Sequence, residues 1–458
     1  MNRGELDQQH VWHPFTQMRD WNAPGHEPVV LVAGEGAVLR DDRGREYLDG
    51  NSSIWTNLHG HRRREIDQAI RDQLDRLAHS SFLGLTNDVA PLLAAELVEA
   101  AGLPAHKVFF SDDGSTATEA ALKMVFQARI QRGEPQRTLF LSLGSGYHGD
   151  TIGAMSAGHS ALFHRAYRPL LFKTREVLSP ACYRCPYNQA KPVRGSDART
   201  TRSCNWECVG ELEKALEDPR ASALVMEPRV QGAAGMTMHP DGYLERAAAL
   251  CRARGVWLVL DEVMTGFGRT GTMFAFQQEK NVKPDLLALA KGLTAGYLPV
   301  AATLASPEIF DAFLGEFSEL KTFFHGHSYT GNALGCAAGR ANLQIFRDDR
   351  TLEKNGALQE LLATETQRFW SHPNVGDVRQ EGLICAIEIV RNFETREAFP
   401  FADRIGHRIC ETARAHGLLT RPVGDVLVLM PPYCTTPTQL RRMVEALWLG
   451  LGEVLPTG

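Results

Sequence analysis

The stretch VWLVLD at residues 256–261, followed by DLLALAKG at residues 285–292, decides the fold of this chain. The interior of each run is apolar at every position, a pattern typical of strands buried on both faces of a parallel sheet. Four more such runs follow the same rhythm: KVFF at 107–110, TLFLSL at 138–143, SALVM at 222–226 and LPVAATLA at 298–305. Helical stretches separate the runs, which predicts a doubly wound α/β domain with a mainly parallel sheet.

The two ends of the chain carry other patterns. Residues 36–50 read as a hairpin turning at 42–44, and residues from 65 onward have apolar positions three and four apart, as in a helix. Beyond 334 we expect a helix over 337–345, strand pairs over 378–390 and 418–430, and a last helix from 436. We therefore predict a large domain at 61–333, a smaller α/β domain at 334–458, and an N-terminal segment, 1–60, that packs with the smaller domain.

Length and charge exclude several classes of protein. The 458 residues are 43% hydrophobic and 22% charged, and 49 basic against 54 acidic residues leave a net charge of −5. This balance argues against a nucleic-acid scaffold or a polybasic membrane binder. The N-terminal sequence lacks the apolar core of a signal peptide, and no apolar stretch approaches the roughly 18 residues of a membrane span. We expect a cytoplasmic protein of enzyme size.

Residues 179–209 interrupt the strand–helix rhythm, and we interpret them as an insertion on the surface of the large domain. Four of the nine cysteines lie here, as Cys182-x-x-Cys185 and Cys204-x-x-x-Cys208. Two such pairs are compatible with a tetrahedral zinc site or an iron–sulfur cluster that clips a long loop. Incidental thiols in a tolerant loop are the alternative, slightly favoured by the uneven second spacing. We assign no metal.

Polar residues end three of the apolar runs: Glu227, Asp261 and Lys291. In open α/β sheets ligands bind beyond the carboxyl ends of the strands, so these side chains should face one crevice. A strand-end acid is often only a helix cap, and a strand-end lysine is often a surface residue. Lys291, however, lies between an apolar run and Gly292. Burial there would lower its pKa and make it a nucleophile.

Two turns at the same sheet edge add further candidates. SDDGST at 111–116 precedes a helical run, 117–128, and a glycine–hydroxyl turn at a helix N-terminus can bind a phosphate. Helix capping by its hydroxyl groups is the plain alternative. Tyr147, in GYHG at 146–149, could stack on a planar ring or simply pack under a loop. A phosphate cradle, an aromatic, an acid and a lysine together suit pyridoxal phosphate: the aldehyde needs an amine and the pyridinium nitrogen a carboxylate.

Longer motifs now add a resemblance. LDEVMTGFGRTG at 260–271, with Lys291-Gly292, resembles the sequence pattern of class III aminotransferases, the omega-type enzymes of fold type I. The shorter motifs WHPFTQM at 12–18, GYHGDT at 146–151, FFHGHSYTGN at 323–332, TRP at 420–422 and LMPPY at 429–433 resemble the branch of this family that acts in biotin biosynthesis. The resemblance covers nearly the whole chain, from about residue 10 to 433, apart from the insertion.

The resemblance implies a function for the chain. It is pyridoxal-phosphate-dependent transamination of 8-amino-7-oxononanoate to 7,8-diaminononanoate, with S-adenosylmethionine or lysine as amino donor. The implied fold is fold type I, a large doubly wound domain plus a smaller α/β domain. The implied active unit is a homodimer with active sites at the subunit interface, acting on small molecules without nucleic acid or membrane.

The resemblance also implies roles for individual residues. Lys291 holds the cofactor and shuttles a proton, Asp261 pairs with the pyridinium nitrogen, and Tyr147 lies over the ring. Gly114 and Ser115 bind the phosphate, and His327 and Ser328 reach the phosphate of the neighbouring subunit. The residues expected at the substrate are Trp55, Tyr147, Lys291, Gly326 and Arg421, the last as anchor for the far carboxylate.

The sequence leaves the donor, the roles of two residues and the exact reaction open. Some relatives have tyrosine at Phe15 and a tryptophan pair at Ile54-Trp55, so the donor and the substrate pocket can differ here. Arg269 is either a site residue or half of a structural ion pair, and Glu227 is more a supporting residue than a catalyst. Another omega-aminotransferase acting on a diamine or β-amino acid, or a pyridoxal phosphate aminomutase, remains an alternative function. A binding module without catalysis is the weakest option.

Overall fold

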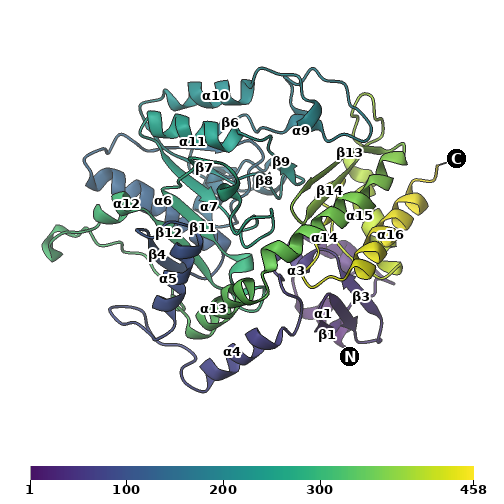
Figure 1. Ribbon diagram of the computed structural model, residues 1–458, viewed down its shortest axis with the longest axis horizontal. Helices are drawn as coiled ribbons and strands as arrows, with labels where there is room; N and C mark the ends of the chain where they lie inside the picture. The colour runs from purple at the N-terminus through teal and green to yellow at the C-terminus, as the bar shows by residue number, and fades with distance from the viewer. Residues whose placement is uncertain (1, 458) are drawn as a thin grey trace.

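A seven-stranded sheet forms the centre of the computed structural model, which describes residues 2–457 (Figure 1). Its strand order is β4 (Lys107–Ser111), β12 (Ala301–Ala305), β11 (Leu286–Leu289), β10 (Trp257–Asp261), β7 (Ala221–Met226), β5 (Leu139–Leu143) and β6 (Arg175–Val177). All six apolar runs identified in the sequence are strands of this sheet. Only β12 runs antiparallel to its neighbours, β11 and β4, and the other pairs are parallel. The predicted α/β fold with a mainly parallel sheet is confirmed.

Helices cover both faces of the sheet, and successive residues of a strand therefore enter different cores. In β10, Leu258 and Leu260 pack in a cluster with α5 (Ala90–Ala100), α10 (Glu207–Leu216) and α11 (Tyr243–Ala253). Trp257 and Val259, which alternate with them, pack against α6 (Gly114–Gln131). This two-sided burial explains why the strand sequence is apolar throughout.

A second unit lies on the right of Figure 1 and contains the C-terminal strands and helices. Its antiparallel sheet is β13 (Val375–Glu381), β14 (Ile384–Ile389) and β16 (Val426–Leu429), packed with α14 (Thr351–Thr366), α15 (Ile405–Ala415) and α16 (Pro437–Val454). The pairing expected within 418–430 is wrong, because β16 joins β14 while β15 (Leu418–Leu419) joins another sheet.

That other sheet is N-terminal. It contains β1 (Leu31–Glu35), β2 (Val38–Asp41) and β3 (Glu46–Asp49), with β15 added parallel to β3. β2 and β3 form the hairpin expected over 36–50. The domain boundaries drawn from the sequence stay a prediction. Within residues 2–457, no helix is both long and apolar enough to cross a membrane.

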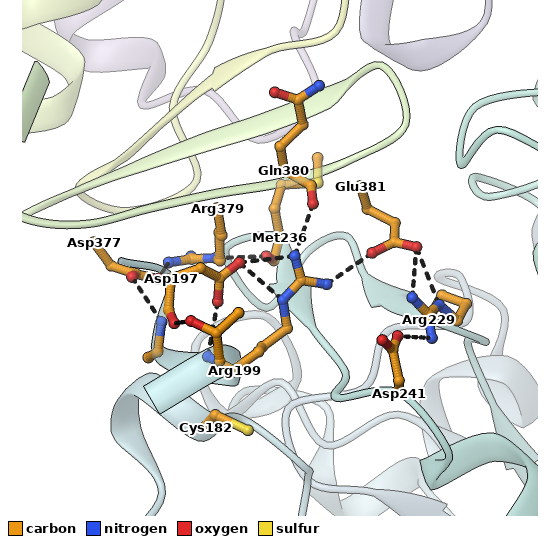
Figure 2. Close-up of polar contacts among 12 residues, drawn as sticks. Cys182, Asp197, Arg199, Arg229, Met236, Asp241, Asp377, Arg379, Gln380 and Glu381 are labelled. Atoms are coloured by element: carbon orange, nitrogen blue, oxygen red, sulfur yellow. Dashed lines mark hydrogen bonds and ion pairs between the residues drawn. The ribbon is translucent and has the colours of Figure 1, made fainter. Parts of the chain in front are cut away.

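We expected the insertion at 179–209 to lie on the surface of the large unit. It also contacts the second unit (Figure 2). Arg199, after the start of α9 (Ala198–Thr201), donates to Asp197, to Glu381 at 2.7 Å and to the Gln380 carbonyl. Glu381 also accepts from Arg229, which follows β7, at 2.7 Å. All these charged side chains are largely buried. The insertion is thus tied to the end of β13 through one shared carboxylate.

Candidate active site

Lys291 follows β11 and begins a short 3-10 turn, Lys291–Thr294, at the edge of a cavity of about 410 Å³. Asp261 at the end of β10 and Glu227 after β7 line the same cavity. The three strands are neighbours in the sheet, which is why their carboxyl ends meet here. Burial lowers the pKa of the Lys291 amine, although Asp261 and Glu227 oppose that shift. The amine is therefore a better nucleophile than an exposed lysine would be.

The Asp261 carboxylate is buried and held on both oxygens. Oδ1 accepts from the Val263 backbone N–H at 3.0 Å, and Oδ2 lies 2.8 Å from Nδ1 of His148. Burial lowers the pKa of His148, but Asp261 outweighs it and raises that pKa overall. His148 is thus held against the Asp261 carboxylate and fixes its orientation in the cavity. No role for His148 follows from the sequence, where its place directly after Tyr147 is the one available signal.

Glu227 joins two loops on the wall of the cavity. Its Oε1 accepts from the Tyr147 backbone N–H at 3.4 Å and its Oε2 from the Gly232 backbone N–H at 2.8 Å. Burial raises the pKa of this carboxyl to about 7. Glu227 therefore supports the turn that carries Tyr147, in agreement with the supporting role expected for it.

Gly114 and Ser115 begin α6 and line the cavity. As the first two helical residues they have no intrahelical acceptor for their N–H groups, and the N-cap Asp113 satisfies Thr116 instead. A Cβ on Gly114 would lie 2.6 Å from Cγ1 of Val263, so only glycine fits. Gly149 has a φ of +124°, and a Cβ there would lie 2.1 Å from Oγ of Ser115. The turn is therefore a close-packed cradle of backbone donors at a helix N-terminus.

Trp55 lies over the lysine, with its ring centroid 5.1 Å from Nζ of Lys291. It ends a turn of four consecutive residues, 52–55, whose φ angles are all left-handed, from 45° to 68°. Such a conformation costs about 1–2 kcal/mol per L-residue. Ser53 repays part of this cost by donating its N–H and its hydroxyl to Asp49, and Ser52 by donating to the Met430 carbonyl.

Tyr147 is half-buried in the cavity wall, and its hydroxyl donates to Asp150 at 2.8 Å. Its ring contacts Phe163 edge-on at 6.0 Å, and Phe163 contacts Phe15 in the same way at 5.2 Å. The three rings lead from the lysine cavity toward a larger one of about 1510 Å³, and Ala233 lines both cavities. Phe163 was not singled out from the sequence, because a single aromatic in a short helix carries no pattern.

Arg421 lines the larger cavity and not the one that contains Lys291. Its guanidinium is exposed and donates only to the Phe15 carbonyl, at 3.2 Å, among residues 2–457. The planar group is thus free to receive a carboxylate beyond the aromatic rings.

Gly326, His327 and Ser328 do not line the cavity around Lys291. His327 Nδ1 lies 2.7 Å from Oδ2 of Asp112, and the Ser328 carbonyl accepts from His79. Gly326 and Ser328 are exposed. Within one chain, these three residues stay outside the site that contains the other candidates.

Arg269 and the cysteines lie outside the cavity that contains Lys291. Arg269 is fully buried and donates to the carbonyls of Pro431 and Asn57, both at 3.0 Å, so it is neither a site residue nor part of an ion pair in the described structure. All nine cysteines are free thiols, and residues 2–457 contain no group of three or more His, Cys, Asp or Glu side chains arranged to hold a metal.

Comparison with known proteins assigns the family. The family model for aminotransferase class III matches residues 21–449. The chain belongs to the class III aminotransferases. An adenosylmethionine-8-amino-7-oxononanoate aminotransferase from Geobacter sulfurreducens is 48% identical over 445 residues, which cover 97% of this chain and 96% of the relative.

Solved structures of other class III aminotransferases have the same fold. The crystal structure of adenosylmethionine-8-amino-7-oxononanoate aminotransferase from Methanocaldococcus jannaschii matches with a TM-score of 0.90 and 40% identity, covering 98% of both chains. An amine transaminase from an uncultivated Pseudomonas species, in its PLP-bound form, matches with a TM-score of 0.86 and 34% identity, covering 97% of this chain and 98% of its own. The predicted family and fold are confirmed.

Class III aminotransferases depend on pyridoxal phosphate, and the cavity of this family member fits that cofactor. Lys291 offers an amine for the aldehyde, and Asp261 a carboxylate for the pyridinium nitrogen. The N-terminus of α6, at Gly114 and Ser115, offers backbone donors for the phosphate. All these parts line one cavity of about 410 Å³.

Proposed function

We propose that this class III aminotransferase transfers an amino group to 8-amino-7-oxononanoate and so forms 7,8-diaminononanoate for biotin biosynthesis, with S-adenosylmethionine or lysine as donor. Five relatives named adenosylmethionine-8-amino-7-oxononanoate aminotransferase are 42–49% identical over nearly the full length of this chain, which supports the assignment. The observation that carries the proposal is the placement of Arg421. Three aromatic rings separate this exposed guanidinium from Lys291, as a long apolar substrate with a distant carboxylate requires.

Bound pyridoxal phosphate supplies an aldehyde that condenses with amines and a ring that accepts electrons from the substrate α-carbon. Lys291 then acts at Nζ. Burial lowers the pKa of Lys291, so its amine would be available to hold the aldehyde and to carry a proton to or from the substrate carbon. Asp261, oriented by His148, would offer its carboxylate to the ring nitrogen. Tyr147 and Trp55, which line the cavity, would restrict the ring and limit the access of water to Lys291.

We further propose a cytoplasmic homodimer in which Gly326, His327 and Ser328 complete the site of the neighbouring subunit. These residues stay outside their own chain's cavity. Large apolar side chains next to them in the sequence are exposed: Phe324 at 72% and Tyr329 at 62%. An apolar surface of this kind is typical of an interface.

One experiment tests the reaction. The purified enzyme is given 8-amino-7-oxononanoate with either S-adenosylmethionine or lysine, and diamine formation is followed by mass spectrometry. Product with one of the two donors supports the proposal and identifies the donor. Absence of product with both, together with amine transfer in a panel of simple amines, would favour an amine transaminase, the activity of the Pseudomonas neighbour.

A further inference from the structure

The backbone that carries Lys291 is held in a conformation that L-residues rarely adopt. Lys291 has a φ of +26°, and Ala295, at the end of the same turn, has a φ of +52°. Inside the turn, Leu293 N–H donates to the Ala290 carbonyl at 2.6 Å and Ala295 N–H to the Gly292 carbonyl at 3.0 Å. Two strained residues flanking so short a turn relax unless the surrounding structure fixes them.

Asn342, on α13 (Ala333–Asp348), supplies such a contact from outside the turn. Its Nδ2 donates to the carbonyls of Gly292 and Leu293, both at 2.9 Å, and its side chain is fully buried. Carbonyl oxygens only accept hydrogen bonds, so the amide orientation is fixed and Oδ1 must face the other way. There it lies 2.8 Å from Nε2 of His59. His59 therefore carries its proton on Nε2 and donates it to Asn342.

His59 is itself held in place and stays neutral. Its ring packs edge-on against Phe346 at 5.1 Å and against Tyr433 at 6.0 Å. Burial lowers the pKa of His59 to about 4, so the ring does not titrate in the neutral range. Every polar atom of the Asn342 side chain thus has a fixed partner. Two of its three hydrogen bonds end at the residues that directly follow Lys291.

We infer that Asn342, backed by His59, is a positioning residue that locks the strained lysine turn and so aims the Lys291 amine into the cavity. The inference rests on the proposed function only in taking Lys291 as the reactive amine. Neither Asn342 nor His59 lines the cavity, so both act through the backbone and not on the substrate. A buried amide that merely filled space in the core would have no reason to direct both donors to the lysine turn.

The test uses Asn342→Leu, which keeps the branched shape and the number of side-chain heavy atoms and removes all three hydrogen bonds. Asn355→Leu is the matched control: Asn355 is equally buried, lies on α14 and lines neither cavity. Two readouts are followed on the full-length enzyme. One is hydrogen exchange of the backbone amides at 291–297. The other is the rate at which added pyridoxal phosphate becomes fixed to Lys291, after borohydride reduction and peptide mass spectrometry.

In Asn342→Leu we expect exchange at 291–297 to accelerate about ten-fold or more, and attachment of pyridoxal phosphate to slow by a similar factor. The Leu293 carbonyl loses its side-chain donor, and the Gly292 carbonyl keeps only the Ala295 N–H. Asn355→Leu should change neither, even where its melting temperature falls as much. Unchanged exchange and attachment in Asn342→Leu, or equal changes in the control, would overturn the inference.

A second pair of variants tests the support from His59. His59→Gln keeps a donor toward Asn342 and should retain most of the attachment rate, whereas His59→Leu should approach Asn342→Leu. Equal rates in the two His59 variants would show that the hydrogen bond does not matter. Neither readout needs the oxononanoate. The positioning role of Asn342 can therefore be confirmed even where the proposed substrate is wrong, and it can be refuted even where that substrate is right.

Discussion

Replacement of Arg421 by alanine gives the sharpest test of how the substrate lies. Hydrogen bonds to a charged group contribute about 1.5–3 kcal/mol each, and about 1.4 kcal/mol corresponds to a factor of ten. The lower part of this range applies, because the Arg421 guanidinium is exposed and must also give up the Phe15 carbonyl at 3.2 Å. We therefore expect the KM for 8-amino-7-oxononanoate to rise about ten- to thirty-fold. The contact is the same in the ground state and the transition state, so kcat should stay within about three-fold.

The assay is steady-state diamine formation at saturating donor, with the oxononanoate varied. Arg404→Ala is the matched control, since Arg404 lines the same cavity but pairs with Asp20 at 2.8 Å. It should leave KM unchanged. A KM for Arg421→Ala within three-fold of the native value, or an equal rise in Arg404→Ala, would place the carboxylate anchor elsewhere and refute the reasoning.

Three more variants test the site and its support. Lys291→Ala should lower turnover by about a thousand-fold or more and abolish covalent attachment of pyridoxal phosphate; near-native turnover would exclude Lys291 as the reactive amine. Glu227 has its pKa raised to about 7 by burial, so its favourable contribution to stability is present below pH of about 4.5 and is lost as pH rises through 7. From pH 5 to 8 the free energy of unfolding of the native protein should therefore fall by up to about 3 kcal/mol relative to that of Glu227→Gln, both measured in urea without cofactor. If the two free energies change in parallel with pH, this reasoning is wrong. Glu381→Gln should lower the free energy of unfolding by about 2–3 kcal/mol. The loss is smaller than for a buried ion pair with one partner only, because Arg199 and Arg229 each keep another carboxylate. A loss below about 1 kcal/mol in denaturant would count against a shared buried ion pair.

The central sheet was largely predictable because burial on both faces leaves a continuous apolar run. β6 escaped notice, since Arg175 and Glu176 occupy two of its three positions at the sheet edge, where charged side chains reach solvent. The antiparallel direction of β12 could not be predicted from the sequence either. A strand buried on both faces has the same composition whichever way it runs.

For the site, the residues at strand ends were predictable and those supplied by tertiary contacts were not. Lys291 and Asp261 follow apolar runs directly, so their shared crevice follows from topology alone. His148 reaches Asp261 across 113 positions of sequence, and Asn342 approaches the lysine turn from another helix. No local pattern marks such partners, because they are selected by the packing of distant elements.

The left-handed turn at residues 52–55 has a consequence for how this enzyme can diversify. Trp55 lines the cavity around Lys291 and Ile54 precedes it in the same turn, so both positions are natural targets of directed evolution. At these positions the positive φ of the main chain limits which residues are accepted, whatever the substrate requires. Randomised libraries should recover glycine and asparagine more often than their side chains alone would justify, because these residues tolerate a positive φ. Mirror-image stereochemistry makes the same point: a D-residue introduced at Ile54 by chemical ligation would fit the backbone more easily than the natural L-isoleucine.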